Sequence, residues 1–306
     1  MKFLIGKPVK HIELFREGEM YYGDVEKLYD MIPSVLDDME IEYKNLHIKN
    51  NVRHIHKEPD SIYLAWHNHG TLPNIWHLNT AYIPDYFYFD KTGYGPWSEI
   101  VDECDYKIPV EIVRKDIEKF CKEYIDNNVS RFEQPNAAFI PDEPYVLVLG
   151  QRPEDPVSQF AYIDTMSLPE KVANAYKGTK YRVCTKIHPH EAYKCYGTPD
   201  TIEVTGNLNK CIAGASAVYT VNSGSGFESL LHGKRVFTTG RCDYHWATTK
   251  LKTDKDIRDS IEMIDEPIDE DNRIQFLHFM LNYHFMNVND TDSIYRKIIR
   301  AVMEYE

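Results

Sequence analysis

Short apolar runs and longer amphipathic stretches alternate along the chain, most clearly in its second half. Tyr145–Leu149, Tyr181–Thr185 and Ala217–Val221 are apolar runs rich in strand-forming residues, and each is too short for a typical helix. Helical periodicity follows in Leu168–Tyr176 and in the amphipathic tail Asp290–Glu306. Strands that alternate with helices predict parallel βαβ units, and therefore an α/β fold.

The first half has the same two kinds of segment, and a proline-bounded polar stretch separates it from the second. At Pro141-Asp142-Glu143-Pro144 the alternation becomes regular. We therefore expect an N-terminal α/β domain at 1–141, a C-terminal α/β domain at 142–285, and a helix in 286–306 that can pack back on the first domain. In the first half, strands are predicted at Lys2–Ile5, Ile62–Trp66 and Tyr86–Phe89, and helices at Asp24–Asp38 and Val110–Asn128.

Composition narrows the class of protein. The 306 residues are 42% hydrophobic and 27% charged, as in a folded soluble protein. The formal net charge of −13 argues against a general affinity for nucleic-acid backbones, which depends on an excess of Lys and Arg. The six cysteines form no Cys-x-x-Cys pair, which disfavours a zinc site and a disulfide framework. No stretch approaches the ~18 apolar residues of a membrane span, so we predict a cytoplasmic protein without a transmembrane segment.

Three polar loops follow the three apolar runs of the second half. Because ligands of open α/β sheets bind at the carboxyl edge of the strands, we expect these loops to form one site. Their carboxylates, an imidazole beside a lysine, and a Gly/Ser turn before a helix are groups that can hold a phosphorylated donor and cleave it. The loops are Gln151-Arg152-Pro153-Glu154-Asp155, Lys186-Ile187-His188-Pro189 and Asn222-Ser223-Gly224-Ser225-Gly226-Phe227-Glu228.

The third loop has the features of an anion site. It leads into a helix whose first backbone N–H groups lie at the positive end of the helix dipole. Gly224 and Gly226 let the backbone approach a phosphate, while Ser223 and Ser225 can donate hydrogen bonds. The alternative is a helix N-cap in a Gly-rich turn that binds no ligand. Glu228 can accept hydrogen bonds from a ribose, or it is a surface carboxylate that complements the dipole.

The other two loops supply a candidate nucleophile and a phosphate clamp. Lys186 and His188 lie two apart on an extended segment and therefore share one face. A rigidly held carboxylate such as Asp155 can act as nucleophile or base near a sugar's anomeric carbon, with Glu154 as its competitor. The alternative for Asp155 is a turn-forming residue in a proline-rich loop. Donor binding is further assigned to Gln151, Arg152, Pro189 and Asn222.

The first half carries candidate acceptor-binding residues on two loops that follow strands. His67 and His69 come after one strand, and Asp90 and Lys91 after the next. These groups can bind or deprotonate an acceptor hydroxyl. The His-x-His spacing also suggests a metal, but no third ligand stands nearby at a recognisable spacing, so we predict no metal site.

The second half resembles the capsule polysaccharide biosynthesis family, which includes the bacterial β-Kdo glycosyltransferases. The resemblance implies a GT-B-like α/β fold, in which two Rossmann-like domains face each other across a cleft and the C-terminal domain binds a nucleotide-activated donor. It also implies a retaining transfer with Asp155 as nucleophile and with His188, Ser223 and Ser225 on the nucleotide's phosphate. The matching elements are Gln151-x-x-x-Asp155, Lys186-x-His188-Pro189, Asn222–Gly226, Glu228 to Val236, Gly240 and Tyr244.

We therefore expect a metal-independent glycosyltransferase without a cofactor, which uses a CMP- or UDP-sugar as its donor substrate. The expected acceptor is a hydroxyl of a glycan, or less favourably a hydroxymethylated base in phage DNA, since the charge of −13 opposes extensive duplex contact. Two alternatives stay open. One is a nucleotide-sugar epimerase or hydrolase on the same scaffold, and the other is a non-catalytic nucleotide-sugar-binding module.

Overall fold

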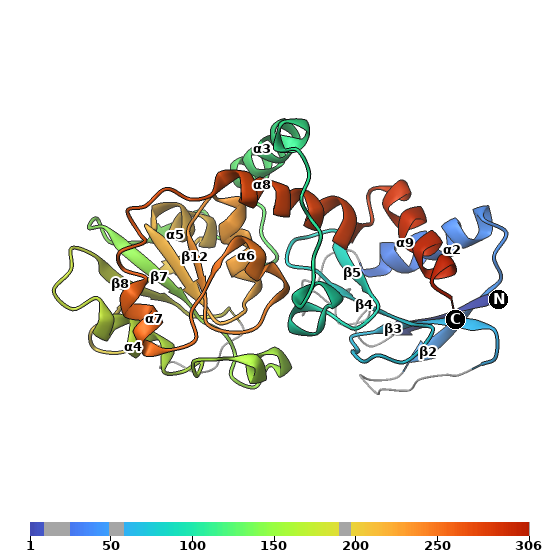
Figure 1. The fold of residues 1–306 in the computed structure, drawn as a ribbon, viewed down its shortest axis with the longest axis horizontal. Helices are drawn as coiled ribbons and strands as arrows, with labels where there is room; N and C mark the ends of the chain where they lie inside the picture. Colours follow the sequence, from blue (N-terminus) through green and yellow to red (C-terminus); the bar gives the residue numbers. More distant parts are fainter. Residues whose placement is uncertain (9–24, 49–57, 190–196, 306) are drawn as a thin grey trace. The chain divides into compact units, whose positions relative to one another are not determined.

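The computed structural model describes residues 1–8, 25–48, 58–189 and 197–305. The chain folds as two compact units, each built around its own β-sheet. The first unit combines residues 1–104 with 278–306, and the second comprises residues 105–277 (Figure 1).

The sheet of the first unit has six strands in the order β14-β5-β4-β3-β1-β2. Strands β2, β1, β3 and β4 are parallel, whereas β5 runs antiparallel to β4 and β14 antiparallel to β5. The carboxyl end of β5 therefore does not lie at the same edge as that of β3. The strands are β1 (Lys2–Pro8), β2 (Tyr43–Ile48), β3 (Ser61–Trp66), β4 (Ile75–Thr80), β5 (Tyr86–Asp90) and β14 (Phe285–Asn287).

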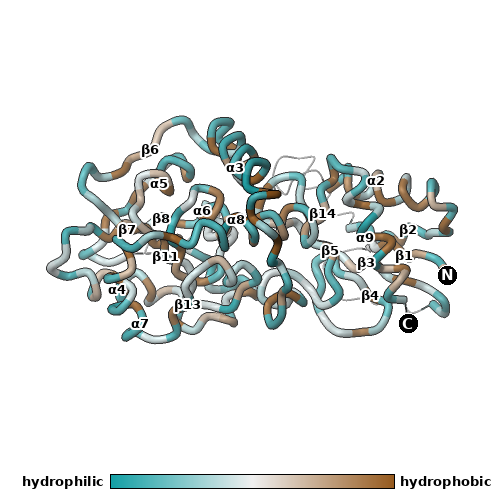
Figure 2. Tube along the Cα trace, turned by 45° about the horizontal axis from the view of Figure 1, so that its top comes forward, coloured by the Kyte–Doolittle hydropathy of each residue, from teal (hydrophilic) through white to brown (hydrophobic). Residues whose placement is uncertain are grey.

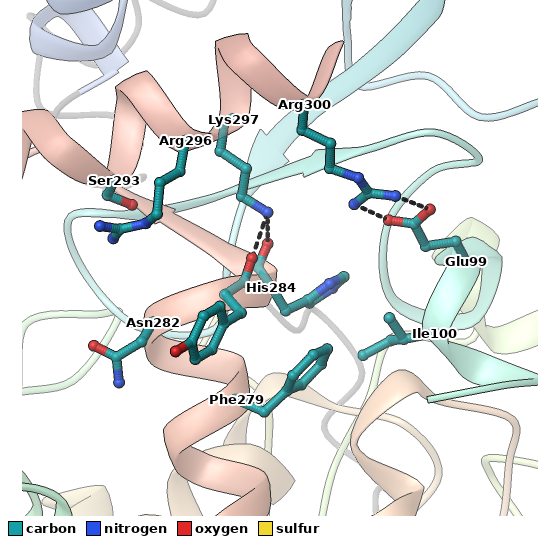
Figure 3. A pocket seen from close by; sticks show the side chains of 10 residues that line it. Glu99, Ile100, Phe279, Asn282, His284, Ser293, Arg296, Lys297 and Arg300 are labelled. Carbon is teal, nitrogen blue, oxygen red and sulfur yellow. Dashed lines mark hydrogen bonds and ion pairs between the residues drawn. The ribbon is translucent and has the colours of Figure 1, made fainter. Parts of the chain in front are cut away.

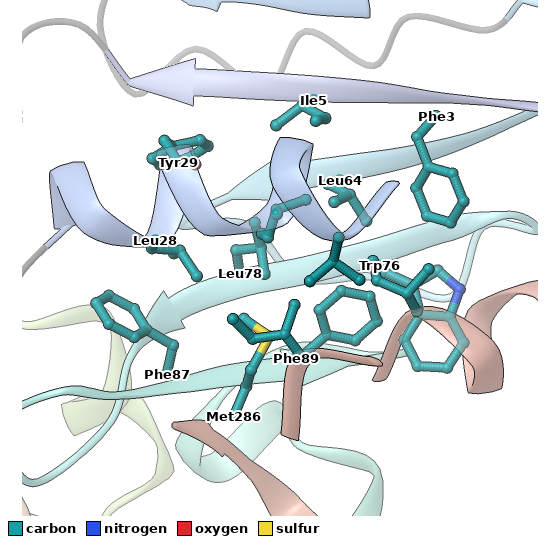
Figure 4. Close-up of a cluster of buried hydrophobic side chains, with 14 of the residues drawn as sticks. Phe3, Ile5, Leu28, Tyr29, Leu64, Trp76, Leu78, Phe87, Phe89 and Met286 are labelled. Atoms are coloured by element: carbon teal, nitrogen blue, oxygen red, sulfur yellow. The ribbon is translucent and has the colours of Figure 1, made fainter. Parts of the chain in front are cut away.

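Two helices, α2 (Val25–Asp38) and α9 (Thr291–Met303), contribute their apolar faces to the core of this unit. Leu28 and Tyr29 of α2 lie over the strands, against side chains such as Leu78 (Figure 4). Each large apolar side chain buried in this way contributes roughly 1.5–3 kcal/mol. The short helices η1 (Gly95–Trp97), η2 (Glu99–Val101) and the π-helix η5 (Met280–His284) complete the unit.

The sheet of the second unit is parallel throughout, in the order β13-β12-β11-β7-β8-β9. All five residues of β7 are buried, as expected for a central strand covered on both faces. The strands are β7 (Tyr145–Leu149), β8 (Arg182–Lys186), β9 (Ile202–Glu203), β11 (Ala217–Thr220), β12 (Val236–Thr238) and β13 (Thr249–Lys250), and β6 (Ala138–Phe139) pairs separately with β10 (Thr205–Gly206).

The helices that follow these strands complete the βαβ units. Figure 2 shows hydrophobic residues along the central strands, while the exposed length of α3 is largely hydrophilic. The helices are α3 (Val110–Asp126), α4 (Leu168–Ala175), α5 (Leu208–Gly214), α6 (Gly224–Leu231), α7 (Asp254–Asp259) and α8 (Glu270–Phe279), with the short helices η3 (Pro156–Phe160) and η4 (Asp243–Ala247).

The α/β class predicted from the alternation of strands and helices is confirmed, but the division of the chain differs from the predicted one. The structure separates the units after Cys104 and after Leu277 instead of at 141 and 285. Residues 105–141 join the second unit because α3 packs on α6, where the Tyr124 hydroxyl donates to the Glu228 carboxylate at 2.8 Å. The final helix α9 packs against α2 within the first unit.

Candidate functional site

The first two loops of the second unit meet at the carboxyl edge of the sheet. Strands β7 and β8 are adjacent and parallel, with Leu149 opposite Lys186. The Gly150 N–H donates to the Lys186 carbonyl at 2.8 Å. A Cβ on Gly150 would lie 2.9 Å from that carbonyl oxygen and 3.2 Å from the His188 nitrogen, so only glycine allows this approach without a shift.

The first and third loops are joined by a buried pair of amide side chains. Gln151 and Asn222 are each 4% exposed. The Gln151 side-chain amide donates to Asn222 Oδ1, and the Asn222 backbone N–H donates to Gln151 Oε1 at 3.1 Å. Asn222 Nδ2 in turn donates to the carbonyls of Val157 and Arg241, at 2.8 and 3.1 Å. Both residues were predicted to bind the donor, and the structure places their side chains in this connection between loops.

The Gly/Ser turn begins helix α6 as predicted. Ser223 is the N-cap, and its hydroxyl accepts from the Ser225 N–H at 3.4 Å. The Tyr244 hydroxyl donates to the Ser223 carbonyl at 2.7 Å, and an added Cβ on Gly226 would lie 2.6 Å from that hydroxyl oxygen. Ser223, Gly224 and Ser225 are partly exposed, so the positive end of the helix is open to an anion.

Lys186 and His188 belong to the same loop but make different contacts. Lys186 Nζ donates to the Gly206 carbonyl at 2.7 Å, and burial lowers the pKa of its ammonium. The His188 ring is partly exposed and meets the Phe132 ring edge-on, with 5.7 Å between centroids. The exposed Pro189 follows it. The His188 ring is therefore accessible from solvent, whereas Lys186 supports β10.

The candidate nucleophile lies at the start of η3. Asp155 is its N-cap residue and is partly exposed, and its carboxylate makes no capping hydrogen bond. Its competitor Glu154 is exposed. The loop is held from within, because the Arg152 carbonyl accepts from the Ser158 hydroxyl at 2.7 Å and from the Asp155 N–H at 3.2 Å.

Glu228 lies in a position that neither sequence alternative described. Its carboxyl is 2% exposed and accepts from the Tyr124 hydroxyl at 2.8 Å, so it is not a surface carboxylate. Burial raises its pKa to about 7, while the nearby Ser130 hydroxyl, the hydrogen bond from Tyr124 and the charge of Arg131 act in the opposite direction. The group is therefore poised to change protonation near neutral pH.

Sequence reasoning missed a segment that lies beside these loops. Arg131 interacts with the Glu228 carboxylate, and Phe132 contacts His188. The Arg131 guanidinium also lies 6.0 Å from the centre of the Phe132 ring. The segment is anchored by Asn207, whose Nδ2 donates to the Pro135 carbonyl at 2.7 Å. Its only sequence signal is a cation next to an aromatic residue in a polar stretch, which is common by chance.

In the first unit, two histidines stack on aromatic rings. The His69 and Trp97 rings are almost parallel, at 3° with 4.2 Å between centroids, and His67 stacks on Tyr94 at 5.4 Å. Gly93 permits this packing at a φ of +154°, because an added Cβ would lie 2.8 Å from the Trp97 Cβ. All four rings are at least partly exposed. We call His67, His69, Tyr94 and Trp97 the ring platform.

The other two acceptor candidates have structural contacts. Asp90 is fully buried and accepts from the Thr92 and Gly93 N–H groups at 2.7 and 2.9 Å and from the Ser98 hydroxyl at 2.6 Å. Burial raises the pKa of its carboxyl to about 6. Asp90 thus shapes the loop that carries the ring platform. Lys91 pairs with Glu304 of α9 at 3.2 Å.

Among the described residues, no group of three or more His, Cys, Asp and Glu side chains could hold a metal ion. In the same part of the chain, no helix combines the length and apolar character needed to cross a membrane.

Comparison with solved structures identifies the fold. Two Thermosulfurimonas dismutans KpsC structures, named as β-Kdo 2,4 and β-Kdo 2,7 transferases, match with TM-scores of 0.55 and 0.56 at 16% and 17% identity. The first match covers 89% of both chains and the second 100% of both. Methanocaldococcus jannaschii UDP-GlcNAc 2-epimerase matches over 99% of both chains, but at a TM-score of 0.39 and 10% identity that likeness favours nothing. The predicted GT-B-like fold class is confirmed.

A family model matches part of the second unit. Residues 178–285 match the model of the capsule polysaccharide biosynthesis proteins, so the predicted resemblance to this family is confirmed. No curated protein matches the chain. The matched residues include the His188 loop and the whole Gly/Ser turn. Together, the family match and the fold support the predicted enzyme class, a glycosyltransferase.

Proposed function

We propose that the protein transfers a sugar from a nucleotide-activated donor, a CMP- or UDP-sugar, to a hydroxyl of a glycan acceptor. One observation carries the proposal: hydrogen bonds through Gly150 and through the Gln151–Asn222 pair tie the three loops to one sheet edge. Ligands bind at this edge in open α/β sheets. The family match over residues 178–285 and the likeness to the KpsC transferases agree with it.

In this proposal the donor's phosphate binds at the start of α6. The backbone N–H groups at the start of α6 and the Ser223 and Ser225 hydroxyls donate to phosphate oxygens. His188 donates from the neighbouring loop, and Arg131 supplies the cation that Lys186, bonded to Gly206, does not. The site needs no metal for this purpose, because the helix dipole and Arg131 oppose the charge that develops on the leaving phosphate.

Asp155 is the proposed nucleophile of a retaining transfer. Its carboxylate attacks the anomeric carbon from the face opposite the phosphate as the bond to the phosphate oxygen breaks. The acceptor hydroxyl then attacks from the face that the phosphate has left, gives its proton to the departed phosphate, and displaces Asp155. Its partial exposure makes the carboxylate accessible for this role. Glu154 is the alternative carboxylate. The ring platform of the first unit is the proposed acceptor-binding surface, with Asp90 shaping its loop.

The test is product analysis with the wild-type protein, Asp155→Asn and Glu154→Gln. Each is incubated with a CMP- or UDP-sugar and a panel of glycan acceptors, and donor, free sugar, epimerised sugar and glycosylated product are separated by chromatography and identified by mass and NMR. We expect glycosylated product with the wild type, a loss of at least ~10³-fold in Asp155→Asn, and little change in Glu154→Gln. A free or epimerised sugar as sole product would favour the hydrolase or epimerase alternative. Nucleotide binding without any turnover would favour the binding module.

A further inference from the structure

A cavity of about 260 Å³ opens within the first unit, between α9, the π-helix η5 and the η2 segment (Figure 3). Neither the donor loops nor the ring platform contributes to its lining. One side is lined by three cations of α9, Arg296, Lys297 and Arg300. Another is lined by the aromatic residues Phe279 and Tyr283. Glu99 is the single carboxylate in the lining.

Lys297 is the deepest of these cations, at 4% exposed. Its Nζ donates to the carbonyls of Tyr283 and His284 at 2.7 and 2.6 Å. These two bonds hold the ammonium at the carboxyl end of η5, and they leave its third N–H without an acceptor among the residues that the structure describes. A buried ammonium with an unused donor is costly unless an anion completes its contacts.

The other charges in the lining are not equally available. Both oxygens of Glu99 accept from Arg300, at 2.7 and 2.8 Å, and Arg300 Nε donates to the Glu304 carboxylate at 2.7 Å, so Arg300 is held by two carboxylates. Arg296 makes one contact with Asp290 at 3.3 Å, and its side chain is half exposed. Arg300 is therefore committed to two carboxylates, whereas Lys297 and the half-exposed Arg296 are the cations of the lining best placed to donate to a ligand.

We propose that this cavity binds a small oxyanion, the phosphate or carboxylate group of a ligand that accepts hydrogen bonds from Lys297 and Arg296. The cavity is larger than such a group alone, and its aromatic side fits the remainder of an organic ligand. The Phe279 and Tyr283 rings lie 6.4 Å apart at 20°, and Tyr283 is 56% exposed at the rim. The proposal does not depend on the proposed glycosyltransferase activity.

The surroundings of Lys297 make anion binding pH-dependent. Burial is the main cause that lowers its pKa to about 7; Arg300 and Arg296 lower it further, and Glu99 and Asp90 raise it. The neighbouring His284 stays neutral, because burial and the charges of Lys297 and Arg300 hold its pKa well below the usual value. A bound anion favours the protonated ammonium. Affinity should therefore be higher at pH 6 than at pH 8.5.

The experiment measures binding of inorganic phosphate, glucuronate and neutral glucose to the full chain by titration calorimetry, at constant ionic strength in chloride. Two variants remove cations of the cavity, Arg296→Gln and Lys297→Met. Arg258→Gln removes an exposed cation of the second unit and is the matched control. His188→Ala weakens the proposed donor site, where phosphate can also bind. Binding in the cavity should survive His188→Ala and Arg258→Gln.

We expect phosphate, glucuronate or both to bind, glucose not to bind, and Arg296→Gln to weaken binding about tenfold, as for the loss of one charge-assisted hydrogen bond. Binding should also weaken from pH 6 to pH 8.5 in the wild type. If Lys297→Met does not fold, Arg296→Gln decides. A response to phosphate alone identifies a phosphate ligand, and one to glucuronate alone a carboxylate ligand. No binding of either anion, or binding that Arg296→Gln leaves unchanged, would overturn the proposal.

Discussion

The hydrogen-bonded pair Gln151–Asn222 should be needed both for stability and for the donor site. Gln151→Met keeps the length of the side chain but removes its amide, and with it both bonds to Asn222. Two net hydrogen bonds contribute about 1 kcal/mol each, and the buried Asn222 N–H that loses its acceptor costs about 1–3 kcal/mol. Since these two effects overlap, we expect the free energy of unfolding to fall by about 2–4 kcal/mol.

Urea denaturation measures this change, with an unchanged slope as evidence that the unfolded state is unaffected. The matched control is Gln159→Met in the same loop. Gln159 is exposed and its amide donates only to the Pro156 carbonyl at 2.7 Å, so its replacement should change stability by less than about 0.5 kcal/mol. Nucleotide binding should also weaken in Gln151→Met at temperatures where the variant is folded. A stability loss equal to that of the control, together with unchanged nucleotide binding, would refute this prediction.

Three further predictions concern residues around the Gly/Ser turn. Gly226→Ala should cost about 1–3 kcal/mol of stability by overpacking against Tyr244, and Tyr244→Phe in the same chain should restore part of it, as measured in urea. Glu228→Gln tests the carboxyl pKa of about 7, which is raised above the value in the unfolded chain. In the wild type this carboxyl therefore makes its full contribution to the free energy of unfolding below pH 4.5. That contribution, up to about 3 kcal/mol, is lost as the pH rises through 7. The variant should lack that loss, and parallel pH profiles of the two unfolding free energies would contradict the assignment. Arg131→Gln should weaken nucleotide binding about tenfold in calorimetry, whereas the exposed Arg182→Gln should not; equal affinities would remove Arg131 from the site.

The central strands and the Gly/Ser turn were predictable because their signals are local. Strand β7 is buried on both faces, so its apolar run shows in the sequence without knowledge of its neighbours. Likewise, Ser223 caps α6 through a contact only two residues away. The order of three such strand and loop units was sufficient to predict one sheet edge with one site.

The remaining features depend on tertiary contacts that no local pattern encodes. The burial of Glu228 was not predicted, because its partner Tyr124 comes from a helix 104 residues earlier in the chain. The same packing placed α3 in the second unit and moved the division of the chain. Asp90 looked like an acceptor ligand because the sequence does not reveal that β5 runs antiparallel to β4. In each case, a polar residue beside a strand had a partner that only the fold could supply.

Nucleotide binding is the most direct test of the proposed donor site. The thermal midpoint of the full chain is measured against CMP, UDP, GDP and ADP for the wild type, His188→Ala and the matched control His47→Ala, an exposed histidine of β2. A ligand that binds only the folded state raises the midpoint by mass action. We predict that CMP or UDP stabilises the wild type and the control, and that the shift disappears in His188→Ala. No shift with any nucleotide, or an equal shift in all three proteins, would contradict a nucleotide-sugar site at the carboxyl edge of this sheet.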